Sequence, residues 1–274
     1  MITTLQSIFH YPVKSLGGNR TKVAKIYPEG MRHDRRWLIT DSDGRFITAR
    51  QYPQMLLWQA HINDQQHLTL TTPKGEHKTV STQDCEQITA VTVWKDSFIA
   101  HTAPDTINQW LSKHLETPCL LHYLGDDSQR PLTGYNDNSK LTFADSAPYL
   151  LTTQASLAAL NQQLDKPVTM THFRPNFVIE GDFTPWIEDQ WRDIRIGEVQ
   201  FEFLKCCTRC VMINIDPKTG EKSVTHQPFK TLQRIHRERA NINIEGTRTE
   251  TVFGIHLVAK NSGTISIDSA VYLA

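Results

Sequence analysis

The sequence has no net charge, no long apolar run and no disulfide framework, and each absence excludes a class of protein. Lys plus Arg equal Asp plus Glu at 29 each in 274 residues, so no overall field recruits nucleic acid or an anionic membrane. No apolar run approaches the roughly 20 residues that span a bilayer. The five cysteines follow no framework spacing, and no secretory signal precedes them. We therefore expect a soluble, cytoplasmic protein with neither a nucleic-acid nor a membrane partner.

Several common catalytic motifs are also missing. The sequence has no Gly-x-Gly-x-x-Gly, no Walker loop, no His-Glu-x-x-His and no Gly-x-Ser-x-Gly. Nucleotide binding, zinc proteolysis and α/β-hydrolase chemistry therefore lack the sequence features on which they usually depend. The 12 histidines are scattered without a pairing pattern, which is typical of ordinary surface or core histidines.

Most of the sequence has the pattern of short β-strands. In the first hundred residues, turn-forming segments separate strand-like segments, which predicts three hairpins. The predicted strand pairs are 36–40 with 45–48, 67–71 with 78–81, and 90–94 with 98–100. Further strands are predicted at 149–151, 177–180, 193–197 and 199–203. Strands of this length and spacing are typical of a small barrel or sandwich.

Helices are expected at only a few places. Apolar periodicity predicts a helix at 104–115, a capping threonine predicts one at 153–164, and a proline suited to the first turn predicts one at 228–237. Residues 125–140 are polar and contain few apolar side chains. We place a domain boundary, or the mouth of a mobile loop, in that stretch.

Three of the five cysteines, Cys206, Cys207 and Cys210, lie within five positions of one another. Alternation predicts a strand at 201–205 before them, and residues 211–215 predict a second strand after them, ended by a Pro/Gly turn. The cysteines would then lie in the connection between two strands. Functional side chains often collect in such connections.

Clustered thiols of this kind allow four interpretations. Cys207 and Cys210 have the Cys-x-x-Cys spacing of half a zinc site, but the remaining cysteines, Cys85 and Cys119, are isolated. A structural disulfide and a set of small buried side chains are two further possibilities. The fourth is a single thiolate ligand for a soft transition metal. Arg209 favours it, because a guanidinium beside a thiol lowers the thiol pKa.

The segment 207–220, CTRCVMINIDPKTG, resembles the C-terminal motif of the MOSC superfamily, in particular the mitochondrial amidoxime-reducing component and its bacterial YcbX-like relatives. The resemblance runs nearly end to end. The other matching segments are 11–15, 34–38, 46–51, 143–145, 173–176 and 261–263, in the family's order. Several independent motifs in one order are far more specific than Cys-x-x-Cys alone.

The resemblance implies a fold and a domain division. The fold is mainly β with a few helices, in the α+β class, with a MOSC β-barrel preceded by a smaller N-terminal β domain. We accordingly divide the chain into an N-terminal barrel-like domain at 1–125 and a MOSC domain at 126–274. The strand pattern agrees with this architecture, although only the resemblance supplies its topology.

The resemblance also implies a cofactor, molybdenum bound to molybdopterin. Lysine and arginine suit a pterin phosphate, because they form charge-assisted hydrogen bonds with its oxygens. The residues that correspond to the family's phosphate side are Lys14, Ser15 and Arg35. Those that correspond to the pterin side or its support are Arg50, Asp145, Ser146, Arg174 and Asn176, with Arg209 as a further cofactor-binding residue. Arg36 follows Arg35, which leaves open which arginine faces the phosphate.

Cys210 corresponds to the thiolate that ligates the metal, and we expect Cys206 and Cys207 to be dispensable. No side chain is an obvious general acid. Asp216 is one candidate for a catalytic role, and a metal-bound or ordered water is another.

The activity implied by the resemblance is the reduction of N-hydroxylated compounds, namely hydroxylamines, amidoximes and N-hydroxylated nucleobases. The cofactor supplies the two-electron chemistry. Bacterial relatives often continue into a [2Fe–2S] domain, but its C-x4-C-x2-C spacing is absent here. We expect no iron–sulfur cluster in this chain and a separate electron donor, either an iron–sulfur or haem protein or a flavin reductase. The alternative is a MOSC sulfur-carrier module that handles a cysteine persulfide without a permanent metal.

Overall fold

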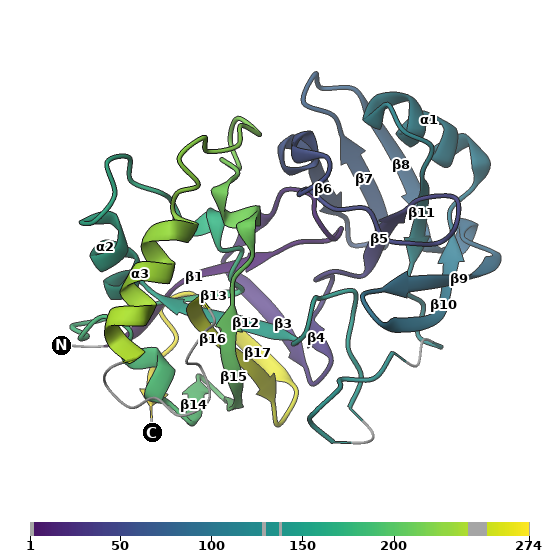
Figure 1. Ribbon diagram of the computed structural model, residues 1–274. Helices are drawn as coiled ribbons and strands as arrows, with labels where there is room; N and C mark the ends of the chain where they lie inside the picture. The colour runs from purple at the N-terminus through teal and green to yellow at the C-terminus, as the bar shows by residue number, and fades with distance from the viewer. Residues whose placement is uncertain (1–2, 128–129, 137–138, 241–250, 274) are drawn as a thin grey trace.

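The computed structural model describes residues 3–127, 130–136, 139–240 and 251–273 (Figure 1). Within these residues the strands form four sheets, and three α-helices are present. The expected fold, mainly β with a few helices, is therefore confirmed.

The largest sheet has eight strands in the order β18-β14-β15-β16-β12-β13-β1-β2. Neighbouring strands are antiparallel except β12 and β13, which are parallel and are joined through helix α2. A parallel pair needs such a crossover, because a tight turn only joins antiparallel strands. The bounds are β1 Thr4–His10, β2 Asn19–Thr21, β12 Tyr149–Thr153, β13 Phe177–Glu180, β14 Asp193–Ile196, β15 Val199–Thr208, β16 Val252–Ala259 and β18 Val271–Leu273.

A small sheet covers the core of the large one. Its order is β17-β3-β4, with β3 at Val23–Tyr27, β4 at Gly30–Met31 and β17 at Gly263–Ser266. Buried and exposed residues alternate along β3, as expected for a strand with one face on a core. Ile26 and Ile265 pack in the same cluster as Leu5 and Phe201, so the start of the chain folds onto its second half.

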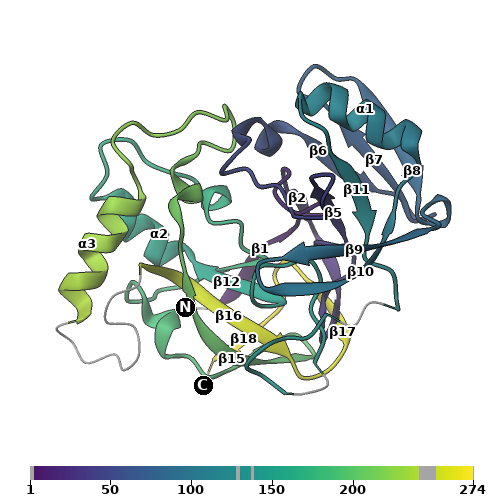
Figure 2. The ribbon, with the colours of Figure 1, turned by 45° about the vertical axis from the view of Figure 1, so that its right-hand side comes forward.

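The other two sheets, in the orders β5-β11-β10-β9 and β6-β7-β8, form an N-terminal unit with helix α1. Ile107 and Leu111 of α1 share a core with Leu68 of β7 and Leu121 of β11. Figure 2 shows α1 over these strands and far from α2 and α3. The bounds are β5 Trp37–Thr40, β6 Gln59–Ile62, β7 His67–Thr71, β8 His77–Ser81, β9 Gln87–Val93, β10 Asp96–Thr102, α1 Asp105–Leu115 and β11 Leu120–Tyr123.

Helices α2, at Gln154–Asn161, and α3, at Phe229–Ala240, lie side by side against the large sheet (Figure 1). The Thr153 hydroxyl accepts a hydrogen bond from the backbone N–H of Ser156, which confirms the predicted cap of α2. Leu232 and Ile235 of α3 are buried against Phe253 of β16. Five 3₁₀ helices complete the described secondary structure: η1 Pro53–Leu57, η2 Thr82–Asp84, η3 Met170–His172, η4 Ile187–Gln190 and η5 Val211–Asn214.

Two strand predictions are wrong. The hairpins predicted at 67–81 and 90–100 are confirmed, but residues 45–48 form no strand and make only isolated bridges. The Asp41 carboxylate accepts hydrogen bonds from the backbone N–H groups of Asp43 and Arg45, so that segment closes as a loop. Residues 211–214, predicted as a strand, form the 3₁₀ helix η5.

The domain boundary at 125/126 stays a prediction. Strand pairing crosses it, because β1 pairs with β13 and β3 pairs with β17. Within the polar stretch where we placed the boundary, residues 128–129 and 137–138 lie outside the described residues. The described part includes a bridge between Pro131 and Lys140.

Candidate cofactor site

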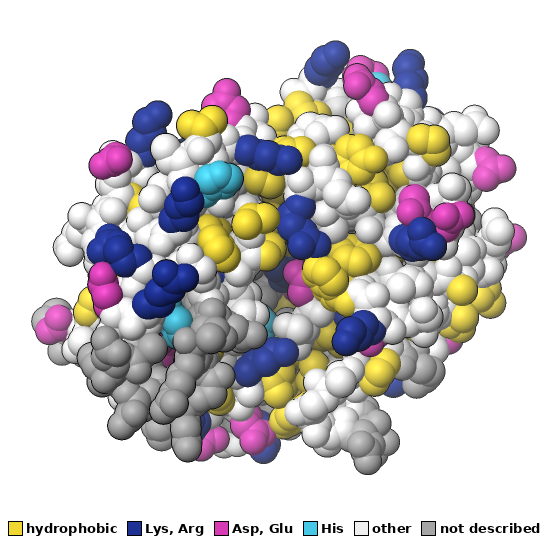
Figure 3. Space-filling model, in the orientation of Figure 1, with side chains coloured by type: hydrophobic (Ala, Val, Ile, Leu, Met, Phe, Trp, Pro, Cys, Tyr) yellow, Lys and Arg dark blue, Asp and Glu magenta, His cyan; other side chains and the backbone are white. Residues whose placement is uncertain are grey.

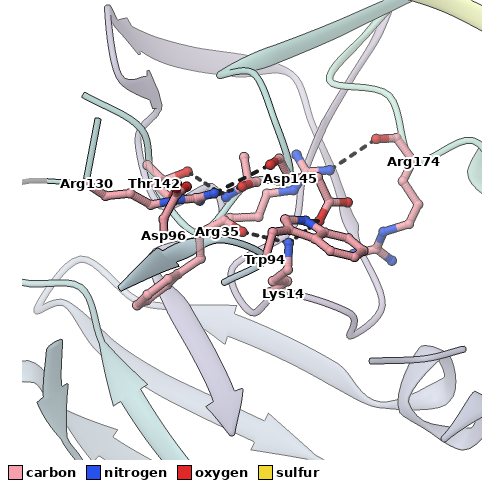
Figure 4. A network of polar contacts seen from close by, with 10 residues as sticks. Lys14, Arg35, Trp94, Asp96, Arg130, Thr142, Asp145 and Arg174 are labelled. Atoms are coloured by element: carbon pink, nitrogen blue, oxygen red, sulfur yellow. Dashed lines mark hydrogen bonds and ion pairs between the residues drawn. The ribbon is translucent and has the colours of Figure 1, made fainter. Parts of the chain in front are cut away.

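Segments that match the family motifs meet at one place in the fold. They are the loop after β1, the residues before β5, and the segments that lead into β12 and β13. Figure 3 shows a hollow on one face of the molecule, bordered by basic and acidic side chains, and Figure 4 shows residues from these segments close together. We call Lys14, Arg35, Arg174 and Arg209 the cationic cluster.

Tyr11 is the centre around which two of these cations pack. The guanidinium carbons of Arg35 and Arg174 each lie 4.2 Å from the centroid of its ring, which is cation–π geometry. The Tyr11 hydroxyl donates to the carbonyl of Pro175 at 3.2 Å. Burial raises the pKa of Tyr11 to about 12, so the ring stays neutral. A Cβ at Gly18 would collide with this ring, and the loop needs glycine there.

Both arginines have left-handed backbone conformations, with φ of 49° at Arg35 and 54° at Arg174. Such angles are uncommon for residues other than glycine and often mark functional positions. Arg35 donates to the carboxylate of Asp34 at 2.6 Å and to the carbonyl of Arg174 at 3.2 Å. Arg174 donates to the carbonyl of Leu16 at 2.6 Å. The backbone and these bonds therefore fix both guanidinium groups.

Lys14 is buried and is paired with Asp145 (Figure 4). Its Nζ lies 2.5 Å from Asp145 Oδ1 and 2.9 Å from the carbonyl oxygen of Phe143. Trp94 Nε1 donates to the same carboxylate oxygen at 3.0 Å. Desolvation opposes ionisation of Asp145, but Lys14 and Trp94 outweigh it and hold the pKa of this carboxyl well below its usual range. Burial lowers the pKa of Lys14, and Asp145 opposes that effect.

Arg130 supports the segment that presents Asp145, and sequence reasoning missed it. It is 1% exposed and donates to the carbonyls of Thr142 and Ala144 at 2.5 and 2.6 Å. It also forms an ion pair with Asp96 of β10 at 3.0 Å. Arg130 lies in the polar stretch 125–140, where no apolar periodicity indicates which residues are buried.

The structure separates Arg35 from Arg36. Arg35 points into the cationic cluster, whereas Arg36 donates to the carbonyl of Gly125 at 2.9 Å and to the carboxylate of Asp126 at 3.0 Å. Of the two, Arg35 is therefore the one that lies in the cationic cluster.

The remaining predicted residues lie around this group in different roles. The guanidinium of Arg50 lies 5.0 Å from the ring of Trp94, and Ser15 is buried next to Lys14 with φ of 71°. Ser146 is half-buried beside Asp145. The Asn176 amide is occupied by the protein itself, since it accepts from the backbone N–H of Leu150 at 3.1 Å and donates to a backbone carbonyl. Asn176 is thus placed as support.

The cysteines do not lie where the sequence predicted. Cys206 and Cys207 belong to β15, and only Cys210 follows that strand, immediately before η5. Cys206 is half-buried and Cys207 is buried, whereas Cys210 is exposed. All five cysteines are free thiols. Cys210 is therefore the thiol of this segment that a ligand can reach.

The guanidinium of Arg209 contacts the thiol of Cys207. Arg209 donates one hydrogen bond to the Cys207 sulfur at 2.9 Å and another to the carbonyl of Phe173 at 2.6 Å. Burial by itself would raise the pKa of the Cys207 thiol. Arg209 and His256 outweigh burial and lower that pKa to about 6.

Asp216 lies in the turn after η5. Its Oδ1 accepts a hydrogen bond from the backbone N–H of Lys218 at 2.8 Å, the arrangement of an Asx turn. The carboxylate also acts on His172, where burial lowers the pKa and Asp216 raises it. This position gives Asp216 a structural role, and its catalytic role stays a prediction.

Among the described residues, no group of three or more His, Cys, Asp or Glu side chains could hold a metal ion. The zinc interpretation of Cys207 and Cys210 therefore finds no further ligands there. Two cavities, of about 600 Å³ beside α1 and about 410 Å³ beside Arg36, are not lined by residues of the cationic cluster. No helix of the described residues has the length and apolar character needed to cross a membrane.

The residues of the cationic cluster fit an anionic cofactor. Arg209 Nε is buried and has no hydrogen-bond partner in the structure, which is costly unless a bound group accepts from it. Burial lowers the pKa of Arg174 to about 10, a penalty that a nearby anion would relieve. Together with the exposed thiol of Cys210, this donor set suits a phosphate-bearing pterin and a metal held by one protein thiolate.

Family models match two parts of the chain, the MOSC N-terminal beta barrel domain at residues 2–118 and the MOSC domain at residues 138–272. Their order is the one expected from the motifs. The chain therefore belongs to the MOSC-domain proteins.

Similarity to individual proteins shows which MOSC-domain proteins are related to this chain. Human mitochondrial amidoxime-reducing component 1 is 28% identical over 286 residues, which cover 99% of this chain and 83% of that protein. Molybdenum cofactor sulfurase of Oryza sativa subsp. japonica is 30% identical over 261 residues, 87% of this chain but 31% of that protein. The crystal structure of the YUAD protein from Bacillus subtilis aligns with a TM-score of 0.42 and 7% identity, over 99% of this chain and 94% of that one. The alignment with the human protein makes the chain a homologue of the amidoxime-reducing component over nearly its whole length.

Proposed function

We propose that this protein is a molybdenum-cofactor-dependent reductase of N-hydroxylated compounds. One observation supports this most strongly. The exposed thiol of Cys210 directly follows Arg209, whose buried guanidinium nitrogen Nε has no hydrogen-bond partner in the structure. The name of the human relative states the reduction of amidoximes, and we extend the substrate class to hydroxylamines and N-hydroxylated nucleobases.

Lys14 and Arg35 would hold the phosphate of the cofactor, as the resemblance implies, since hydrogen bonds to the Phe143 carbonyl and to the Asp34 carboxylate already fix them. Arg174 and Asp145 would support the pterin side, and Cys210 would be the protein's metal ligand. When bound, the cofactor supplies two-electron removal of an oxygen atom. The chain's own share is to neutralise the anion, orient it and leave Cys210 accessible.

Asp216 is the side chain that we propose for proton supply. One of its oxygens accepts a hydrogen bond in the turn, so the turn fixes the position of the carboxylate close after η5. We also propose that electrons come from a separate donor protein and that the protein works in the cytoplasm.

The direct test is to measure molybdenum and released pterin in the purified protein, together with reduction of benzamidoxime and an N-hydroxylated purine by reduced methyl viologen. We expect both cofactor components and activity with the wild type. Cys210→Ala should remove the activity while far-UV circular dichroism stays unchanged, because this side chain is small and exposed. Cys206→Ala serves as the matched control and should stay active.

If the Cys210→Ala variant is as active as the wild type, Cys210 is not the metal ligand. The alternative, sulfur-carrier function, has its own signature in the same preparation. It would give no molybdenum and a Cys210 peptide that is heavier by one sulfur atom.

A further inference from the structure

A stripe of basic side chains lies on α3. Lys230, Arg234 and Arg237 are exposed and have the i, i+4, i+7 spacing that places side chains along one side of a helix. The opposite side of α3 is buried through Leu232 and Ile235. Figure 3 shows Lys and Arg side chains gathered over the position of α3, on the face that contains the hollow. We call Lys230, Arg234 and Arg237 the basic stripe.

The basic stripe is tied to the segment that presents Cys210. Helix η5 begins directly after Cys210, and the Asn214 side chain at its end accepts from the backbone N–H of Phe229 at 2.9 Å. Phe229 is the first residue of α3. The exposed thiol and the stripe are therefore parts of one packed unit.

The charge of this segment differs from that of the whole chain. Lys and Arg balance Asp and Glu overall at 29 each, but residues 216–239 contain six Lys or Arg and three Asp or Glu. Arg239 turns inward to Asp189 at 2.7 Å. Arg234 contacts Glu238 at 3.4 Å, an exposed pair that offsets little of the local field. A positive patch on a neutral protein favours an acidic partner.

Apolar side chains accompany the patch. Val211, next to Cys210, is 54% exposed, and Val224, between η5 and α3, is 92% exposed. Protein interfaces commonly combine an apolar centre with a polar rim. The segment from Cys210 to α3 thus offers both parts.

We propose that the basic stripe, with Val211 and Val224, is the docking surface for an electron-donor protein whose own surface around its redox centre is acidic. This inference rests on the proposed function, in which the electrons come from a separate donor protein. Opposite charges would steer the encounter, and the apolar contacts would hold the complex while Cys210 faces the donor.

The experiment compares two electron sources. Benzamidoxime reduction is measured with saturating reduced methyl viologen and with a reduced acidic [2Fe–2S] ferredoxin, for the wild type and for Lys230→Glu/Arg234→Glu/Arg237→Glu. We expect equal viologen-driven rates and a fall of tenfold or more in the ferredoxin-driven kcat/KM of the variant. The wild-type ferredoxin rate should also fall as salt is raised. Lys74→Glu/Lys78→Glu, on exposed positions of the N-terminal unit, is the control and should match the wild type.

A second readout does not need turnover. Titration of the ferredoxin into the wild type at low salt should show binding that the stripe variant lacks, so a failed proposed function and a failed docking surface are distinguishable. Wild-type ferredoxin kinetics and binding in the stripe variant, or an equal loss in the control, would overturn the proposal. So would stripe-dependent binding to phosphatidylserine vesicles with no binding of the ferredoxin.

Discussion

The Arg209 guanidinium donates a hydrogen bond to the Cys207 sulfur over 2.9 Å, at the end of the strand that precedes Cys210. The same guanidinium bonds the carbonyl of Phe173, and the Arg209 backbone N–H bonds the carbonyl of Thr251 at 2.7 Å. The segment that presents Cys210 is thereby tied on two sides. Cys207 is thus an anionic partner for Arg209 in this structure and is no longer expected to be dispensable.

Cys207→Ser should reduce stability in a pH-dependent way. The folded pKa of about 6 lies below the usual value of 9.0, so the thiolate stabilises the fold fully above pH 9, and this contribution is lost as the pH falls towards 6. Urea unfolding at pH 6, 7.5 and 9 should therefore show that the free energy of unfolding of the variant falls increasingly below that of the wild type. The difference should be on the order of 4 kcal/mol at pH 9. Cys206→Ser is the control. Its difference in free energy of unfolding from the wild type should not grow between pH 6 and 9, because burial raises the pKa of Cys206 to about 12. A deficit independent of pH would mean that Cys207 is a neutral thiol.

Arg35→Gln should lower cofactor occupancy, whereas Arg36→Gln should not. Arg35 lies in the cationic cluster, and Arg36 bonds Gly125 and Asp126 instead. Loss of a charge-assisted phosphate contact costs about 1.5–3 kcal/mol, one to two decades in affinity. The measurement is pterin and molybdenum per chain, with thermal unfolding of the cofactor-free protein as a check on the fold. Full occupancy in Arg35→Gln, or equal loss in both variants, would contradict the assignment.

Glu188 is a buried carboxyl outside the candidate site, and it should make stability fall as the pH rises. It is fully buried, and its Oε2 accepts from the hydroxyls of Thr153 and Ser156 at 3.1 and 2.8 Å. Its Oε1 has no partner in the structure. Burial, followed by the neighbouring Asp189, raises the pKa of Glu188 from 4.5 to about 7.

As the pH rises, the unfolded chain releases this proton near pH 4.5 but the folded protein only near pH 7. Stability should therefore fall between these values, by on the order of 3 kcal/mol. Glu188→Gln should flatten that part of the profile and be more stable than the wild type at pH 8. Urea unfolding from pH 4.5 to 8 measures this, with exposed Glu221→Gln as the control. If the free energy of unfolding changes with pH equally in the wild type and in Glu188→Gln, then Glu188 has the same pKa in the folded and the unfolded chain.

The sequence by itself determined the class of fold and the set of candidate residues. Alternating strands, few helices and several motifs in one order predicted a mainly β MOSC architecture, and Thr153 marked the start of α2 correctly. Such features depend on near neighbours in the chain, so local patterns preserve them.

Only the tertiary structure decided which side chains act on one another. Residues 211–214 form a 3₁₀ helix, and the Asn214 side chain at its end accepts from the backbone N–H of Phe229, a contact that a strand pattern does not encode. Arg209 bonds Cys207, and Arg35 rather than Arg36 enters the cationic cluster. Arg130 is buried in a stretch that composition alone marks as a polar linker. Hydrogen bonds and burial between distant segments set these roles, and the sequence contains no periodic signal for pairs that meet only after folding.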